Sequence, residues 1–215
     1  MSTKLTIGLI ITTLIGLIMI FGFLNKKDND KLFWKWFVKN QNDYYKEGVD
    51  ETLFDRLNYQ LNEIDPNLTF EFSPIHDNGI KDLIISAGGL KESFPSVKRL
   101  VEKAPKIDNW KIIAFRQRLP LDYDSVKYGG IKLSYDDIYF RFSKDSDKIG
   151  VELNIKNFSD VTEFNQAIYL LLDGLLGEYD VETKLSWIER KELDETQIDK
   201  LYRFVELREL VDANK

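Results

Sequence analysis

The side chains that could do chemistry in this sequence are few. His76 is the single histidine and there is no cysteine, which excludes a cysteine nucleophile, a thiolate zinc site and any metal site with two histidines. A Ser-His-Asp triad would have to use His76, but nothing near it resembles a nucleophile elbow. It lies in a loop, residues 74–79, so we expect His76 to be a solvent-exposed loop residue.

Carboxylates are the second candidates, because several converging oxygens hold Mg²⁺ or Ca²⁺. They cluster as Asp122 and Asp124, Asp136 and Asp137, and Asp173, Glu178 and Asp180. The weak metal candidates among them are Asp136, Asp137, Glu178 and Asp180, but no spacing matches a known calcium loop. Asp is also favoured between strands because it bonds the turn backbone. We therefore expect turn or surface roles, no metal, no cofactor and no identifiable catalytic residue.

Two arginines are the third candidates. Arg116 and Arg118 alternate along a predicted strand that begins at Trp110, so the three side chains would share one face. Two guanidinium groups beside an aromatic ring could receive a carboxylate or a phosphate. The alternative is a solvent-facing strand end, at which the arginines pair with Asp122 or Asp124.

Hydrophobic periodicity predicts the elements that must position these residues. The first half contains a helix over 53–64 with Asp50 as its N-cap, a strand at 68–72, a turn at Asn78-Gly79, a strand at 80–87, a helix at 95–104 and a strand at 110–118. The two strands around the Asn-Gly turn are expected to form a hairpin.

The second half continues with a strand at 128–133, a hairpin of strands around the loop 144–148, a helix capped by Asp160 and Glu163 that ends at Gly177, a strand at 181–187 and a helix at 198–210. This order predicts an α+β fold with a mostly antiparallel sheet and helices packed on one face. One continuous sheet is preferred, and a split into two lobes near Leu121 is the alternative.

Charged residues are distributed unevenly along the chain. The 215 residues include 30 Lys+Arg and 36 Asp+Glu, with a mean hydropathy of −0.31, which is enough for a real core and unlike a disordered protein. The net charge of −6 argues against a nucleic-acid partner, which requires clustered cations. All of the acidic residues follow residue 24.

Residues 5–24 contain no charged side chain and are long enough to cross a bilayer as a helix. The apolar positions of this segment include Leu5, Ile10, Leu14, Leu17, Ile20 and Leu24. A signal peptide would have a shorter apolar region and a small-residue cleavage site, so residues 1–24 are interpreted as a single membrane anchor that contacts the lipid bilayer. Gly8, Thr12 and Gly16 form a stripe that would permit self-association of the helix.

Lysines set the predicted orientation. Only Lys4 precedes the span, whereas Lys26, Lys27, Lys31, Lys35 and Lys39 follow it, so the positive-inside bias predicts a cytoplasmic C-terminal domain at the cell membrane. A polar linker, residues 25–32, leads to the Trp-rich segment 33–38. That segment is either an interfacial aromatic belt or part of the core of the domain 33–215, and we favour the core.

The chain from Phe33 onward resembles a family of uncharacterised bacterial proteins, over roughly residues 33–212. The resemblance is carried by Phe33-Trp34-Lys35-Trp36-Phe37, Asn67-Leu68-Thr69-Phe70-Glu71-Phe72, Asn109-Trp110-Lys111-Ile112-Ile113-Ala114-Phe115-Arg116 and Asp173-Gly174-Leu175-Leu176-Gly177-Glu178-Tyr179-Asp180. The family has no established activity, so the resemblance implies no catalytic residue. It does imply that the Trp-rich segment belongs to the domain.

The leading hypothesis is a membrane-tethered, non-enzymatic domain that binds a protein partner, with an immunity or inhibitor role as one form of it. No catalytic constellation is present, and an acidic, aromatic-rich domain suits a basic partner. The alternatives are a hydrolase or transferase with a carboxylate-bound metal, and an anion-binding sensor that uses Arg116 and Arg118. Enzymatic activity stays open but is the less favoured interpretation.

Overall fold

The computed structural model describes residues 28–46, 48 and 50–214. The predictions made for residues 1–24, namely the anchor, its orientation and its small-residue stripe, lie outside this part of the chain. Within the described part, no helix is both long and apolar enough to cross a membrane.

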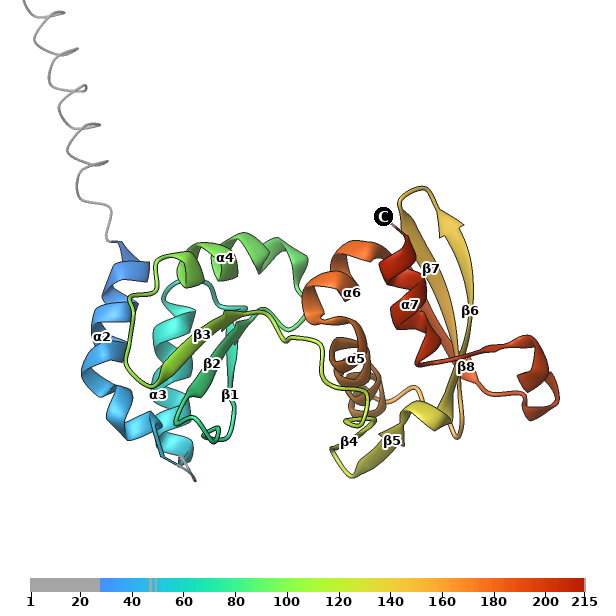
Figure 1. Ribbon diagram of the computed structural model, residues 1–215, viewed down its shortest axis with the longest axis horizontal. Helices are drawn as coiled ribbons and strands as arrows, with labels where there is room; N and C mark the ends of the chain where they lie inside the picture. The colour runs from blue at the N-terminus through green and yellow to red at the C-terminus, as the bar shows by residue number, and fades with distance from the viewer. Residues whose placement is uncertain (1–27, 47, 49, 215) are drawn as a thin grey trace, which may run out of the picture.

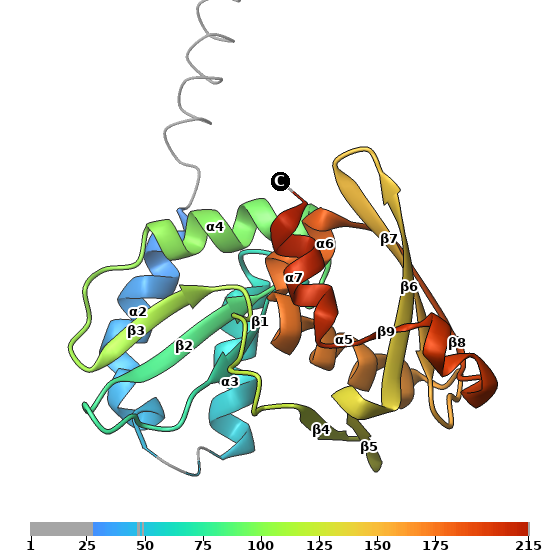
Figure 2. The ribbon, with the colours of Figure 1, turned by 45° about the vertical axis from the view of Figure 1, so that its right-hand side comes forward.

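The described residues form an α+β fold with two lobes (Figures 1 and 2). We define the first lobe as residues 28–118 and the second as residues 119–214. Each lobe has its own core, because the buried apolar residues fall into one cluster between Phe33 and Phe115 and another between Leu133 and Val211. The two cores therefore lie on either side of the polar loop near Leu121.

The first lobe contains a three-stranded sheet of order β1-β2-β3 and three helices. Its elements are α2 (Asn29–Tyr44), α3 (Glu51–Asn62), β1 (Thr69–Phe72), β2 (Lys81–Ser86), a 3₁₀ turn (Lys91–Ser93), α4 (Phe94–Glu102) and β3 (Trp110–Ala114). Strands β1 and β2 pair antiparallel, whereas β2 and β3 pair parallel. One face of the sheet, which includes Phe72, Leu83 and Ile85, packs on the helices. The opposite face, with Glu71, Ile84 and Ile113, is turned toward the second lobe.

The second lobe contains a four-stranded sheet of order β8-β7-β6-β9 and a separate two-stranded sheet, β4-β5. Its elements are β4 (Ser125–Tyr128), β5 (Ile131–Ser134), a 3₁₀ turn (Tyr135–Asp137), β6 (Ile138–Asp145), β7 (Lys148–Ile155), α5 (Thr162–Leu176), α6 (Glu178–Lys184), β8 (Leu185–Glu192), a 3₁₀ helix (Glu195–Lys200), β9 (Tyr202–Arg203) and α7 (Glu206–Ala213). The apolar face of α5 and the alternating apolar residues of β7 form most of this core.

Several local predictions are confirmed. Asp50 caps α3, with its carboxylate accepting from the Leu53 amide. The hairpins β1-β2 and β6-β7 form as expected. Gly177 ends α5 with a φ of 85°, a conformation that glycine adopts without strain. Phe33, Trp34 and Phe37 are buried, so the Trp-rich segment belongs to the first core.

The prediction of one continuous sheet is wrong, although four of the six strand pairs among the described residues are antiparallel, as expected. The described residues form three separate sheets, and the two larger ones each contain a parallel pair, β2 with β3 and β7 with β8. In both cases the connection between the paired strands passes through a helix, and such crossovers allow parallel pairing. Periodicity alone identifies strands but not their partners.

Several predicted boundaries are also wrong. The predicted strand 128–133 is instead the β4-β5 hairpin, because Gly129 and Gly130 adopt positive φ angles and reverse the chain. The predicted strand 181–187 begins only at Leu185, since α6 precedes it. The predicted helix 198–210 begins only at Glu206, after a 3₁₀ helix and β9.

The ends of two helices differ from expectation. Asp160 does not cap α5: it accepts from the Asn165 side chain, and Val161 is the N-cap residue. The linker expected over 25–32 is at least partly helical, since α2 begins at Asn29 with Asp28 as its N-cap. The first lobe therefore starts closer to the apolar segment 5–24 than the sequence indicated.

Candidate functional site

The two lobes meet around Glu178, at the start of α6. This residue is fully buried. Its Oε1 accepts from the amides of Ala87 and Gly89, both at 3.1 Å, and its Oε2 accepts from the amide of Arg116 at 3.1 Å. A buried carboxylate is tolerated when amide donors satisfy it. Glu178, from the second lobe, therefore clamps two segments of the first.

Arg116 follows β3 and crosses the cleft between the lobes. Its Nε donates to Glu71 and its Nη1 donates to Asp173 Oδ2 at 3.1 Å. Asp173 lies on α5 and is 6% exposed. The pKa of Asp173 is raised to about 7, mainly by burial and to a smaller extent by the Glu178 carboxylate, whereas the Arg116 guanidinium opposes the rise.

Glu182 is a further carboxylate in the same cleft. Burial raises the pKa of Glu182, with a contribution from Glu178 that Lys91 opposes. Among the described residues Glu182 takes part in no ion pair, and its Oε1 lies beside Gly89. Arg116 is thus surrounded by more carboxylate charge than one guanidinium can balance.

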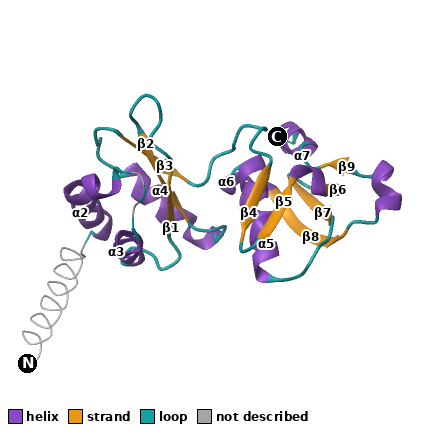
Figure 3. Cartoon of the chain, turned by 90° about the horizontal axis from the view of Figure 1, so that it is seen from below, coloured by secondary structure: helices purple, strands orange, loops and turns teal. Residues whose placement is uncertain are grey.

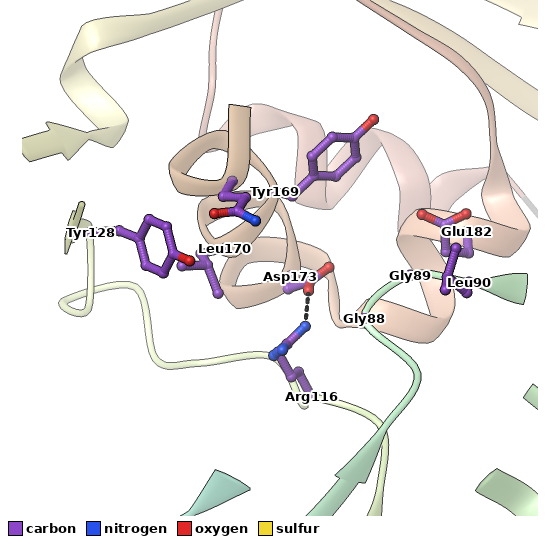
Figure 4. A pocket seen from close by; sticks show the side chains of 10 residues that line it. Gly88, Gly89, Leu90, Arg116, Tyr128, Tyr169, Leu170, Asp173 and Glu182 are labelled. Atoms are coloured by element: carbon purple, nitrogen blue, oxygen red, sulfur yellow. Dashed lines mark hydrogen bonds and ion pairs between the residues drawn. The ribbon is translucent and has the colours of Figure 1, made fainter. Parts of the chain in front are cut away.

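The cleft contains two hollows that share Arg116, Leu170 and Asp173. The one that we call the tyrosine hollow has a volume of about 480 Å³. It is lined by Gly88, Gly89, Leu90, Arg116, Tyr128, Gln166, Tyr169, Leu170, Asp173 and Glu182. Figure 4 shows Arg116 reaching toward Asp173, with Tyr128 on one side of the pair and Glu182 near Gly89 on the other.

The second hollow, which we call the apolar hollow, has a volume of about 520 Å³ and lies against the open face of the first-lobe sheet. Its lining is largely apolar and includes Ile84, Ile113, Leu119, Val126 and Leu171. His76 lies at this hollow, half exposed, with its Nε2 3.2 Å from Asp82 Oδ2. This exposed loop position agrees with the sequence prediction for His76.

The predicted grouping of Trp110, Arg116 and Arg118 on one strand face is wrong. Phe115 adopts a φ of 64°, so β3 ends at Ala114 and the two arginines lie beyond the strand. Trp110 is buried in the first core against the ring of Phe37, with centroids 5.2 Å apart.

Arg118 has a role in holding the second lobe. Its Nε donates to the Leu176 carbonyl at 2.7 Å, and its Nη2 lies 2.8 Å from both Asp180 and Asp212. It thus joins the end of α5 to α6 and α7. The predicted pairing of the arginines with Asp122 or Asp124 does not occur, and both guanidinium groups are engaged by other carboxylates of this chain.

The four metal candidates have separate partners. Asp136 is exposed and lies 3.4 Å from Arg203, whereas Asp137 caps a turn by accepting from Ser134. Glu178 is occupied by amides, and Asp180 pairs with Arg118 and Lys184. The described part of the chain contains no group of three or more acidic or histidine side chains that could hold a metal ion.

Sequence reasoning missed Glu71, Glu182 and the two tyrosines of the tyrosine hollow. One signal was available on α5, where Gln166, Tyr169 and Asp173 recur at helical spacing within an otherwise apolar segment. A polar stripe on such a helix indicates a face that is not simply core. Glu71 and Glu182 give no such signal in the sequence, because their proximity to Arg116 depends on how the lobes meet.

No family model, curated protein or solved structure matches the chain. The resemblance to uncharacterised bacterial proteins therefore stays a prediction, and the cleft is interpreted from its own geometry.

Proposed function

We propose that this protein is a membrane-tethered, non-enzymatic module that binds a protein partner, and that the partner inserts a cationic side chain into the tyrosine hollow. An immunity or inhibitor protein is one form that such a module takes. The tether is the apolar segment 5–24, with the binding domain on the cytoplasmic side. Association through Gly8, Thr12 and Gly16 would place two such domains together.

One observation carries this proposal: the excess of carboxylates around Arg116. Glu71, Asp173 and Glu178 surround it, and Glu182 is nearby without an ion pair among the described residues. A lysine or arginine side chain in the hollow would balance this charge, and the rings of Tyr128 and Tyr169 would contact its methylene chain or its cation. Buried, shifted carboxylates in a cleft are typical of functional sites.

The two alternatives derived from the sequence have less support. A metal-dependent hydrolase would need converging oxygens, but the four candidate carboxylates are engaged in different interactions. An anion sensor would need free guanidinium groups, whereas Arg116 and Arg118 already pair with carboxylates of the chain.

The proposal is tested with two small probes, Nα-acetyl-lysine amide and its neutral counterpart Nα,Nε-diacetyl-lysine amide. Each is titrated against the isotope-labelled protein, and amide shifts are followed for Gly88, Gly89 and Tyr169. We expect the charged probe to bind and the neutral one not to bind. The double variant Asp173→Asn/Glu182→Gln should weaken binding by about tenfold or more, since it removes the charges that face the ammonium group.

The matched control is Asp136→Asn/Glu189→Gln, which removes two exposed carboxylates from the same lobe. It should leave probe binding within about twofold of wild type, because exposed charges are screened. Equal binding of both probes, or equal loss in both double variants, would contradict the proposal. Affinity capture from the native cell with the wild type and the two variants then identifies a partner that depends on the hollow.

A further inference from the structure

Helix α2 presents a row of lysines to solvent. Lys31, Lys35 and Lys39 are spaced four residues apart, so they follow one side of the helix. All three are exposed, and none takes part in an ion pair among the described residues. Nearby Lys103 differs, because Asp28 and Asp30 pair with it. The row is therefore a strip of exposed positive charge on an acidic protein, with Asp28 beside its first lysine.

Apolar side chains lie within the same strip. Leu32 is 43% exposed and Val38 is 42% exposed. At about 100° per residue, these two and the three lysines fall within roughly 120° of the helix circumference. Phe33, Trp34 and Phe37 occupy the opposite, buried side. We call Lys31, Leu32, Lys35, Val38 and Lys39 the lysine face.

A shallow hollow adjoins the lysine face. Its volume is about 560 Å³, and it is lined by Asp28, Lys31, Trp34, Lys35, Val38, Lys103 and Pro105. Mixed lysine and apolar surfaces on one helix side are typical of helices that lie at a membrane interface, where lysine stems cover apolar surface and the ammonium groups contact phosphates.

The position of α2 in the chain also favours contact with a membrane. The helix begins at Asn29, five residues after Leu24, and Lys26 and Lys27 lie between the apolar segment and the helix. Such a short connection keeps α2 near any bilayer that the segment enters. Figures 1 and 3 show α2 at the end of the molecule farthest from the second lobe, so contact with a membrane there would leave the cleft open.

We propose that the lysine face docks on the surface of an anionic membrane, with the lysines on lipid phosphates and with Leu32 and Val38 entering the headgroup layer. The inference rests on the proposed tether. Juxtamembrane lysines are attracted to anionic lipids, and the attraction falls off within a Debye length. The second lobe, with 12 basic against 21 acidic residues, would be repelled if it came close to the same surface. The two effects together orient the domain with the second lobe outward.

The test uses the full chain in vesicles of phosphatidylcholine, with and without added phosphatidylserine. Because the chain has no cysteine, Val38→Cys and Tyr202→Cys each supply one site for an environment-sensitive dye, the first on the lysine face and the second on β9 of the second lobe. Quenching by spin-labelled lipid reports proximity to the bilayer. We expect anionic lipid to raise quenching at position 38 by about threefold or more and to leave position 202 unchanged.

Charge reversal provides the matched comparison. Lys31→Glu/Lys35→Glu/Lys39→Glu, in the Val38→Cys background, should abolish the lipid-dependent quenching, and high salt should do the same to the parent. Equal quenching with and without anionic lipid, or quenching that survives charge reversal, would overturn the docking proposal.

Flotation of the same samples separates docking from tethering. If the chain floats with both kinds of vesicle but position 38 is never quenched, the tether holds and the docking inference fails. If it floats only with anionic vesicles, and charge reversal abolishes this, docking holds and the tether fails. Absence from both kinds of vesicle would overturn both.

Discussion

The two lobes differ in charge and in the makeup of their cores. Residues 28–118 contain 14 basic and 15 acidic side chains, whereas residues 119–214 contain 12 and 21. Seven of the 17 buried apolar residues in the first core are aromatic, compared with four of 20 in the second. The first lobe is thus nearly neutral with an aromatic core, and the second is strongly acidic with an aliphatic core.

The cleft shows what this difference produces. The second lobe contributes Asp173, Glu178 and Glu182, and the first contributes Arg116 and the amides that hold Glu178. The first lobe therefore neutralises only part of the charge that the second lobe buries. The proposed cation site depends on this imbalance, which neither lobe would have by itself.

The largest expected effect comes from the aromatic core. Phe37 is fully buried and contacts the rings of Phe33, Trp34, Tyr44 and Trp110. Phe37→Ala should lower the free energy of unfolding by about 3–5 kcal/mol, because it removes a buried ring and leaves a cavity. Urea denaturation followed by circular dichroism measures this loss, and Val38→Ala, at the exposed neighbour, should change it by less than about 0.5 kcal/mol.

The same variant tests whether the lobes are energetically separate. Hydrogen exchange at β7 of the second lobe should stay near wild type if the cores are independent, while exchange at β2 accelerates. Equal acceleration of hydrogen exchange in both lobes would show that the two cores unfold as one unit. The lobes would then differ in composition but not in stability.

The next largest effect is expected at Glu178, whose carboxylate accepts hydrogen bonds from two segments of the first lobe. Glu178→Gln replaces one acceptor oxygen by an NH₂ group that faces amide donors, so we expect a loss of about 2–4 kcal/mol. Exchange of the Ala87 and Gly89 amides should accelerate, because these amides donate to Glu178. Glu189→Gln on the exposed side of β8 is the matched control. A loss confined to the second lobe, with unchanged exchange at Ala87, would show that the clamp does not couple the lobes.

The sequence was informative where structure is local. Asn78-Gly79 and Gly177 specified a turn and a helix end, and alternation identified both β6 and β7, because these features depend on neighbouring residues. The sequence does not predict how these elements are placed in space. The hydrogen bond from the Ala87 amide to Glu178 joins residues 91 positions apart in the chain, and the parallel pairing of β2 with β3 depends on packing around α4.

The candidate site can be predicted from the sequence only in part. The sequence points to Arg116, Asp173 and Glu178 but not to their arrangement. The predicted strand face shared by Arg116 and Trp110 is wrong, and Glu178, for which a turn or surface role is expected, is fully buried. The raised pKa of Asp173 arises mainly from burial where the lobes meet, with a smaller contribution from Glu178 of the same lobe, and composition and spacing do not reveal that burial.

The smallest expected effect concerns Asp173 and depends on pH. Its pKa is about 7 in the folded protein, above the value of about 3.9 for an unperturbed Asp. Between these values the folded state binds a proton that the unfolded state does not. Stability should therefore fall as pH rises from about 4 to about 7. The Asp173→Asn variant should show a shallower decline over this range, and it should gain about 1–2 kcal/mol at pH 8.

The higher stability expected for Asp173→Asn at pH 8 bears on function as well. If the cleft binds a cation, the ionised Asp173 side chain lowers the stability of the free protein, and the bound cation restores that stability, as is common at binding sites. The variant should then be more stable and bind the charged lysine probe more weakly, while Asp136→Asn changes neither property. Urea denaturation at pH 5 and pH 8 together with probe titration measures both. A variant that is less stable at pH 8 would show that Asp173 serves mainly to hold Arg116 across the junction, and the second lobe's excess charge would then be structural.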